Sequence, residues 1–185
     1  MSEYQGQLLR VLIVEDSADD ALLITRDLKH GGYEPETLRV DTALDMRTAL
    51  SGDAWDLIIA DHNMPRFNSV DALKLASEHD PNIPFIVVSG SIGEEIAVDV
   101  MKSGAHDYVM KDNLARLLPA IDRELREAEN RRDHAKAQQR IHHMAFHDSL
   151  TGLINRAEFE HRLAAAVDSA RYNAEQHALM YIDLD

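Results

Sequence analysis

Five polar side chains stand at the ends of short apolar runs in this 185-residue chain. Glu15 and Asp16 follow the first run, Asp61 follows a later one, and Ser89 and Lys111 stand at the ends of the last two. If these runs are parallel strands, their carboxyl ends meet at one edge of a sheet, where such sheets bind ligands. The five side chains are therefore candidates for one shared site.

These residue types suit phosphoryl chemistry. Three carboxylates at one edge repel one another when ionised, and a hard cation with oxygen ligands relieves that repulsion. Mg²⁺ keeps several waters, so it suits two or three acids better than Ca²⁺ does. Lys111 adds a positive charge and Ser89 a hydroxyl donor. In these surroundings Asp61 can attack a phosphoryl group and form an acyl phosphate.

Each residue taken alone has a plainer interpretation. Acidic residues after a strand often stabilise the positive end of a following helix, as Glu15 and Asp16 could. A lysine near a strand end, such as Lys111, is usually a solvated surface charge. Asp61 with Asn63 could form a simple turn. Their joint occurrence at the ends of successive runs favours the active-site interpretation.

The elements that position these residues alternate up to about residue 113. The apolar runs are continuous and rich in β-branched residues, which is typical of strands buried on both faces of a parallel sheet. We expect strands at residues 11–14, 37–40, 57–60, 85–88 and 108–110. Helix starts are marked by capping residues, which are Ser17, Thr42, Asn68 or Ser69, Ser91 and Asn113. Five strands alternating with five helices predict a doubly wound α/β sandwich.

A long helix is predicted from Asn113 to about His143. Its apolar seam follows a heptad frame and turns polar after Ala128. The apolar members are Leu114, Leu118, Ile121, Leu125 and Ala128. One interpretation is a solvated linker helix. The other is a weak parallel coiled coil that pairs two chains and transmits a signal.

The last stretch, residues 146–185, contains a turn, a helix capped by Asn155, and an expected strand over residues 178–184. One helix and one strand bury too little apolar surface to form a core. We therefore expect the beginning of a second domain that is cut off.

Composition excludes several classes of function. The chain has 33 acidic and 19 basic residues, a formal net charge of −14, which argues against binding nucleic acid. It has no cysteine, which excludes disulfides and thiolate chemistry. Its longest apolar runs are only about five residues, far short of a membrane span, and no secretory signal is visible. A cytoplasmic protein is expected.

Residues 8 to about 128 resemble the receiver domain of bacterial two-component response regulators. The matching motifs are Glu15-Asp16, Asp61 in IIADHNMP, Ser89 in VVSGSIGEE and Lys111 in HDYVMKDNL. The resemblance implies a flavodoxin-like, five-stranded parallel sheet of order 2-1-3-4-5, with helices on both faces. It further implies that a sensor histidine kinase or phosphotransfer protein phosphorylates Asp61 with Mg²⁺ bound.

The same resemblance implies roles for individual residues. Asp16, Asp61 and the carbonyl of Asn63 would hold Mg²⁺, with Glu15 acting through water. Ser89 and Lys111 would contact the phosphoryl oxygens. Tyr108 would match the aromatic switch of the family, which responds when Ser89 moves.

A second resemblance lies in the tail. FHDSLTGLINRAEF, residues 146–159, and the later YIDLD are similar to the start of a diguanylate cyclase (GGDEF) domain. Such domains make cyclic diguanylate from two GTP molecules with Mg²⁺. Asp183 matches the first metal-binding aspartate of that family, an incomplete cyclase metal site. The Gly-Gly-acid-Glu-Phe signature is absent from this sequence, so we expect no cyclase activity from this chain.

The expected organisation has four parts. They are an N-terminal extension (1–7), a receiver domain (8–128), a helical linker (129–145) and the start of a GGDEF domain (146–185). We expect a phosphorelay switch that controls a cyclase in the full-length protein and pairs weakly through its fifth helix. Its only catalysis would be its own phosphorylation and dephosphorylation. The alternatives are a metal-dependent phosphohydrolase and an adaptor that keeps the fold without phosphorylation.

Overall fold

The computed structural model describes residues 6–65, 67–90, 94–173, 175–180 and 182. The chain divides into two compact units, Met1–Arg132 and Asp133–Asp185.

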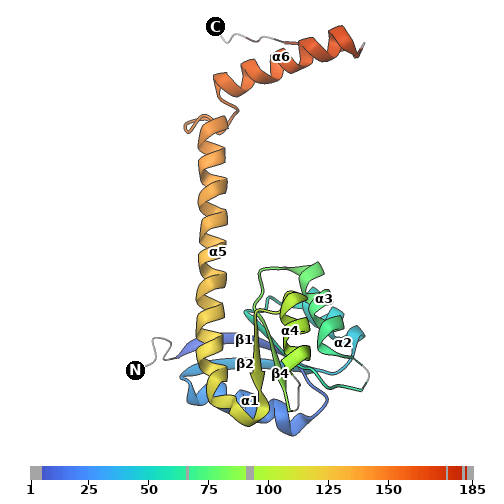
Figure 1. Cartoon of the computed structure of the whole chain (residues 1–185). Helices are drawn as coiled ribbons and strands as arrows, with labels where there is room; N and C mark the ends of the chain where they lie inside the picture. The colour runs from blue at the N-terminus through green and yellow to red at the C-terminus, as the bar shows by residue number, and fades with distance from the viewer. Residues whose placement is uncertain (1–5, 66, 91–93, 174, 181, 183–185) are drawn as a thin grey trace. The chain divides into compact units, whose positions relative to one another are not determined.

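The first unit is built on one sheet of five parallel strands in the order β2-β1-β3-β4-β5. Figure 1 labels β1, β2 and β4 among them. The strands are β1 (Gln7–Val14), β2 (Tyr33–Val40), β3 (Leu57–Asp61), β4 (Phe85–Ser89) and β5 (Asp107–Met110). The predicted fold class and strand order are confirmed. The strand order reverses between β1 and β3, which is where a doubly wound sheet binds ligands.

Helices cover both faces of this sheet. They are α1 (Ala18–His30), α2 (Ala43–Gly52), α3 (Ser69–His79), α4 (Glu94–Lys102), the 3₁₀ helix η1 (Lys111–Arg116) and α5 (Leu117–Phe146). Alternate residues of β1 point to opposite faces, so Leu12 packs with α2, α3 and α4 while Ile13 packs with α1 and α5. The strands β3 and β4 and the second half of β1 contribute buried apolar residues to both clusters, which is why they appear as continuous apolar runs.

Most predicted helix starts are confirmed. Ser17, Thr42 and Asn68 each accept a hydrogen bond from the backbone N–H three residues later. Ser91 lies outside the described residues. The prediction that Asn113 caps the fifth helix is wrong, because α5 begins at Leu117.

The late start of α5 has a physical reason. Pro119 has no N–H to donate to a preceding turn, so it is tolerated only within the first turn of a helix. A start at Leu117 places Pro119 in that turn. Asn113 has non-helical angles (φ −131°, ψ 50°) inside η1, which bridges β5 and α5.

The apolar seam of α5 packs on the chain's own sheet. Ile121 and Ala128 are buried, and Leu114, Leu118 and Leu125 pack against the same cluster as α1. Those residues were expected to meet a second chain. Because Ile121 and Ala128 are already buried within the chain, they are not available to pair with a second chain, whereas Leu114, Leu118 and Leu125 remain partly exposed.

His106 joins the amino ends of β4 and β5. Its backbone N–H donates to the carbonyl of Phe85 at 2.9 Å, and its Nδ1 accepts from the N–H of Phe85 at 3.1 Å. Burial and the charge of Arg131 lower the pKa of the imidazole, while Glu124 and Glu127 oppose this shift. A protonated ring would turn Nδ1 from an acceptor into a donor that faces another donor.

We therefore expect the first unit to lose stability as the pH falls from about 7.5 to about 5. A lowered folded-state pKa gives stability that is present above the unfolded-state pKa and is lost as the pH falls through the folded-state pKa. His106→Asn keeps an acceptor that does not titrate, so its acid-induced loss should be smaller by about 1 kcal/mol. Urea denaturation at both pH values measures this difference. The exposed His79→Asn should behave as wild type, and equal losses in all three proteins would contradict the assignment to His106.

The second unit contains the end of α5 and the helix α6 (Arg156–Tyr172). Asn155 caps α6 as predicted, accepting from the N–H of Glu158 at 3.0 Å. The strand expected over residues 178–184 is not formed at 178–180 or 182, and its other residues lie outside the described part. A strand forms only where neighbouring strands supply partners for its backbone hydrogen bonds. The helix α6 likewise has no buried residues. Across the described residues, every helix is too short or too polar to span a membrane.

Candidate functional site

The five predicted side chains converge at the carboxyl edge of the sheet. Glu15 and Asp16 follow β1, Asp61 and Ser89 end β3 and β4, and Lys111 follows β5. The side chains of Glu15, Asp61 and Ser89 are buried, whereas Asp16 is exposed. Oxygen atoms of Glu15, Asp16 and Asp61 all lie within 4.8 Å of one another.

Lys111 is the positive centre of the site. Its Nζ donates to Glu15 Oε2 at 3.0 Å and to Asp61 Oδ2 at 3.0 Å, and it also contacts Asp20. Burial lowers the pKa of this ammonium, but the three carboxylates outweigh that effect and hold the pKa above its ordinary value. Lys111 therefore carries a full positive charge at neutral pH.

The pKa of the Glu15 carboxyl group is raised in this site. Burial raises the pKa of its carboxyl group, and the nearby charge of Asp61 raises it further. The N–H of Ser17, which donates to Glu15 Oε1 at 3.0 Å, and the Lys111 ammonium both oppose this rise. Burial is the chief cause of this rise, and an additional cation close to the three carboxylates would favour their ionised forms.

The donor set fits Mg²⁺. Three carboxylates within reach of one another offer hard oxygen atoms, which are the ligands this ion prefers. Asn63 also belongs to the site, since its N–H donates to Asp61 Oδ1 at 3.2 Å and its Nδ2 to Ser89 Oγ at 3.4 Å. The first bond places the Asn63 backbone beside the Asp61 carboxylate, and the second places the Asn63 amide beside Ser89.

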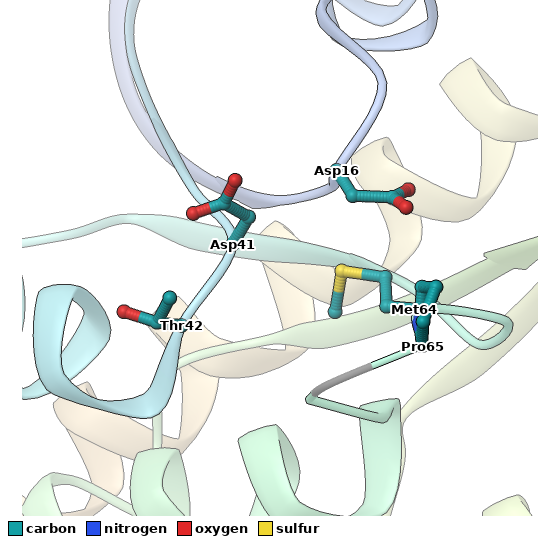
Figure 2. A pocket seen from close by; sticks show the side chains of 5 residues that line it. All are labelled: Asp16, Asp41, Thr42, Met64 and Pro65. Carbon is teal, nitrogen blue, oxygen red and sulfur yellow. The ribbon is translucent and has the colours of Figure 1, made fainter.

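A cleft of about 390 Å³ opens beside the carboxylates (Figure 2). It is lined by Asp16, Asp41, Thr42, Met64 and Pro65. Figure 2 shows Asp16 and Asp41 above Met64 and Pro65 in that view. The cleft gives an outside group access to the acidic edge through Asp16.

Arg39 is a residue that the sequence reasoning missed. From β2 its Nη1 donates to the carbonyl oxygens of Glu15 at 2.8 Å and Asp16 at 3.3 Å, and it pairs with Asp41 at 3.5 Å. It thereby fixes the backbone that carries the acidic pair. The contact of Asp20 with Lys111 was missed as well, although the capping pattern from Ser17 places Asp20 in the first turn of α1.

Tyr108 lies on β5 next to the site. Its side chain is partly buried against the core cluster of α2, α3 and α4, and its hydroxyl donates to Met110 Sδ. Burial and the charge of Asp112 raise the pKa of the phenol, while a bond with Ser89 opposes this, so it is neutral at physiological pH. Asp183 lies outside the described residues.

Two family models match the chain. Residues 11–122 match the response regulator receiver domain, and residues 145–185 match the diguanylate cyclase GGDEF domain. The chemotaxis protein CheY of Thermotoga maritima is 31% identical over 104 residues, which cover 55% of this chain and 84% of CheY. The response regulator protein FleR of Pseudomonas aeruginosa is 32% identical over 109 residues, 59% of this chain and 23% of FleR. The chain thus spans less than a quarter of FleR.

Solved receiver domains share the fold. The beryllofluoride-activated NtrC4 receiver domain dimer is 26% identical, with a TM-score of 0.57 over 64% of this chain and 98% of that one. The receiver domain of the sensor histidine kinase PA1611 from Pseudomonas aeruginosa, solved with magnesium in its active site cleft, is 20% identical. Its TM-score is 0.55 over 65% of this chain and 98% of that one, a likeness in fold. Because the receiver model covers more than half of the chain, this chain belongs to the response regulator family, with a receiver domain followed by a partial GGDEF match.

Proposed function

We propose that this chain is a phosphoacceptor switch in the cytoplasm, in which Asp61 takes a phosphoryl group from a sensor histidine kinase or phosphotransfer protein. The observation that carries this proposal is the contact of the Lys111 ammonium with Asp61 at 3.0 Å, within a cluster of three carboxylates. Membership of the response regulator family supports the same reaction.

The transfer is a displacement at phosphorus. A carboxylate oxygen of Asp61 forms the new bond, the bond between phosphorus and the donor's imidazole nitrogen breaks, and the imidazole leaves and takes a proton from solvent. Lys111, already held beside Asp61, would donate to one phosphoryl oxygen, and the Ser89 hydroxyl would donate to another. The two donors offset charge that gathers on the transferred group.

Mg²⁺ is the proposed cofactor. Asp16, Asp61 and the carbonyl of Asn63 would hold it directly, and Glu15 through water. When bound, the ion supplies positive charge that stabilises the phosphoryl oxygens. The closely spaced carboxylates support this assignment.

Ser89 and Tyr108 are the proposed switch residues. Once Asp61 is phosphorylated, the Ser89 hydroxyl would turn toward the phosphoryl group and give up its bond with Asn63 Nδ2. Tyr108 would then rotate into the space that Ser89 leaves. That rotation would reshape the surface formed by α4, β5 and α5.

The C-terminal part of the chain connects the proposed switch to an output domain. We assign residues 1–7 to an extension, 8–128 to the receiver, 129–145 to a linker and 146–185 to the start of a GGDEF domain. In the full-length protein phosphorylation would control a diguanylate cyclase, with Asp183 in its metal site. The GGDEF match supports this output.

A weak homodimer would connect the switch to that output. Ile121 and Ala128 are buried in the chain's own core, so pairing would use the extension of α5, where Ile141 and Met144 are exposed. Two paired chains could bring two cyclase domains together around two GTP molecules. Sedimentation with and without beryllofluoride tests whether activation increases this pairing.

Intact-mass measurement after treatment with acetyl phosphate and Mg²⁺ tests the phosphoacceptor function. Asp61 would displace acetate, and the protein should gain one adduct of about 80 Da, the mass of one phosphoryl group. The adduct should be stable in acid and labile in base, as an acyl phosphate is. Repeated hydrolysis of an added phosphate ester would indicate a phosphohydrolase instead. The absence of any adduct, together with no response to beryllofluoride, would indicate an adaptor.

A further inference from the structure

Asp20 contacts the Lys111 ammonium from outside the carboxylate cluster. It lies in the first turn of α1, and its side chain is 36% exposed against 9% for Asp61. The three acids close enough to share a metal ion are Glu15, Asp16 and Asp61, and Asp20 is not among them. Asp20 is therefore a fourth carboxylate with a different relation to the site.

The position of Asp20 is fixed by a closed ring of contacts. Glu15 Oε1 accepts from the N–H of Ser17 at 3.0 Å, and Ser17 Oγ accepts from the N–H of Asp20 at 3.2 Å. The carboxylates of Asp20 and Glu15 then both accept from Lys111 Nζ. The segment from Glu15 to Asp20 thus contacts the same ammonium with its first and its last residue.

The ring matters for phosphorylation because the Lys111 ammonium has three N–H donors, one for each of its three acceptors. An ammonium has three N–H groups, and Glu15, Asp20 and Asp61 accept from the nitrogen. A phosphoryl group on Asp61 would take over the bond that Asp61 now accepts. The other two bonds would keep the ammonium in place, because neither acceptor changes in the reaction.

We propose that Asp20 is a positioning residue, which holds Lys111 where the phosphoryl oxygen arrives and does so without belonging to the metal site. This inference rests on the proposed function. Without Asp20 the long, flexible lysine side chain keeps a single lasting anchor, Glu15, and must be ordered by the phosphoryl group itself. The opposite view is that Asp20 only repels the phosphoryl group, in which case its removal would tighten binding.

Titration with beryllofluoride at saturating Mg²⁺ separates these two views. The rise in melting temperature measures the binding of beryllofluoride. We expect Asp20→Ala to need about ten-fold more beryllofluoride for half-saturation, because it loses a charge-assisted hydrogen bond. Asp20→Asn keeps an oxygen acceptor but loses the charge, so its increase should be smaller, about three-fold. Without beryllofluoride, the rise in melting temperature that Mg²⁺ causes should be the same in both variants as in wild type. A general distortion of the site would reduce that rise.

Asp19→Ala is the matched control. Asp19 is exposed in the same turn of α1, so its removal costs the same favourable interaction with the helix end. It should leave the beryllofluoride titration unchanged. Equal or tighter binding in Asp20→Ala, or an equal weakening in Asp19→Ala, would overturn the positioning role. A wild-type protein that fails to bind beryllofluoride would instead overturn the proposed function itself.

Discussion

We expect Asp61→Asn to take up no phosphoryl group from acetyl phosphate under conditions in which the wild-type chain is fully modified. The amide has nearly the shape of the carboxylate, but its oxygen is not a nucleophile toward phosphorus. The site around it should persist, because Lys111 keeps its bonds to Glu15 and Asp20. Intact mass gives the result directly, and the melting temperature verifies that the variant is folded.

Asp41→Asn provides the control for this experiment. Asp41 lies at the same edge of the sheet and lines the cleft with Asp16 (Figure 2). It lies outside the cluster of Glu15, Asp16 and Asp61 and pairs with Arg39. This variant should gain the same adduct as wild type. An adduct of the same size on Asp61→Asn would place the acceptor on another residue and contradict the assignment.

The sequence was sufficient to predict the centre of the sheet, because β3, β4 and the second half of β1 are buried on both faces and therefore stand out as apolar runs. The first halves of β1 and β2 were not predicted. In that region residues such as Arg10 and Glu36 pair through their backbones, and their exposed side chains give no apolar signal. Strand ends at the site were easier, since the polar residues that follow each apolar run mark them sharply.

Contacts made by residues away from the strand ends were beyond the reach of sequence reasoning. Asp20 and Lys111 are 91 residues apart, and Arg39 reaches the carbonyl of Glu15 from 24 residues away. Neither pair leaves a local pattern. The burial of Ile121 and Ala128 within the chain could not be predicted for a different reason, because a helix that packs on its own sheet and a helix that packs on a partner show similar apolar periodicity.

Millimolar Mg²⁺ should raise the melting temperature of the wild-type chain, and Asp16→Ala should abolish that rise. A ligand that binds only the folded state stabilises it by mass action, by about 1.4 kcal/mol at ten times the dissociation constant. Asp16 is the exposed member of the carboxylate cluster and lines the cleft, so it is the acid that an ion from solvent reaches first. Thermal denaturation over a range of Mg²⁺ concentrations measures both effects.

The same substitution should stabilise the protein when Mg²⁺ is removed with a chelator. Burial, as the chief cause, raises the pKa of Glu15, and the charge of Asp61 adds to that rise. The carboxylate oxygens of Glu15, Asp16 and Asp61 lie within 4.8 Å of one another, so they repel one another when no cation is bound. Removing the Asp16 carboxylate lowers that charge and relieves repulsion. Asp41→Asn should keep the wild-type response to Mg²⁺, because Asp41 lies outside the cluster. A full Mg²⁺ response in Asp16→Ala would remove Asp16 from the metal site, whereas loss of the response together with higher stability in chelator is the signature of a carboxylate that holds the ion.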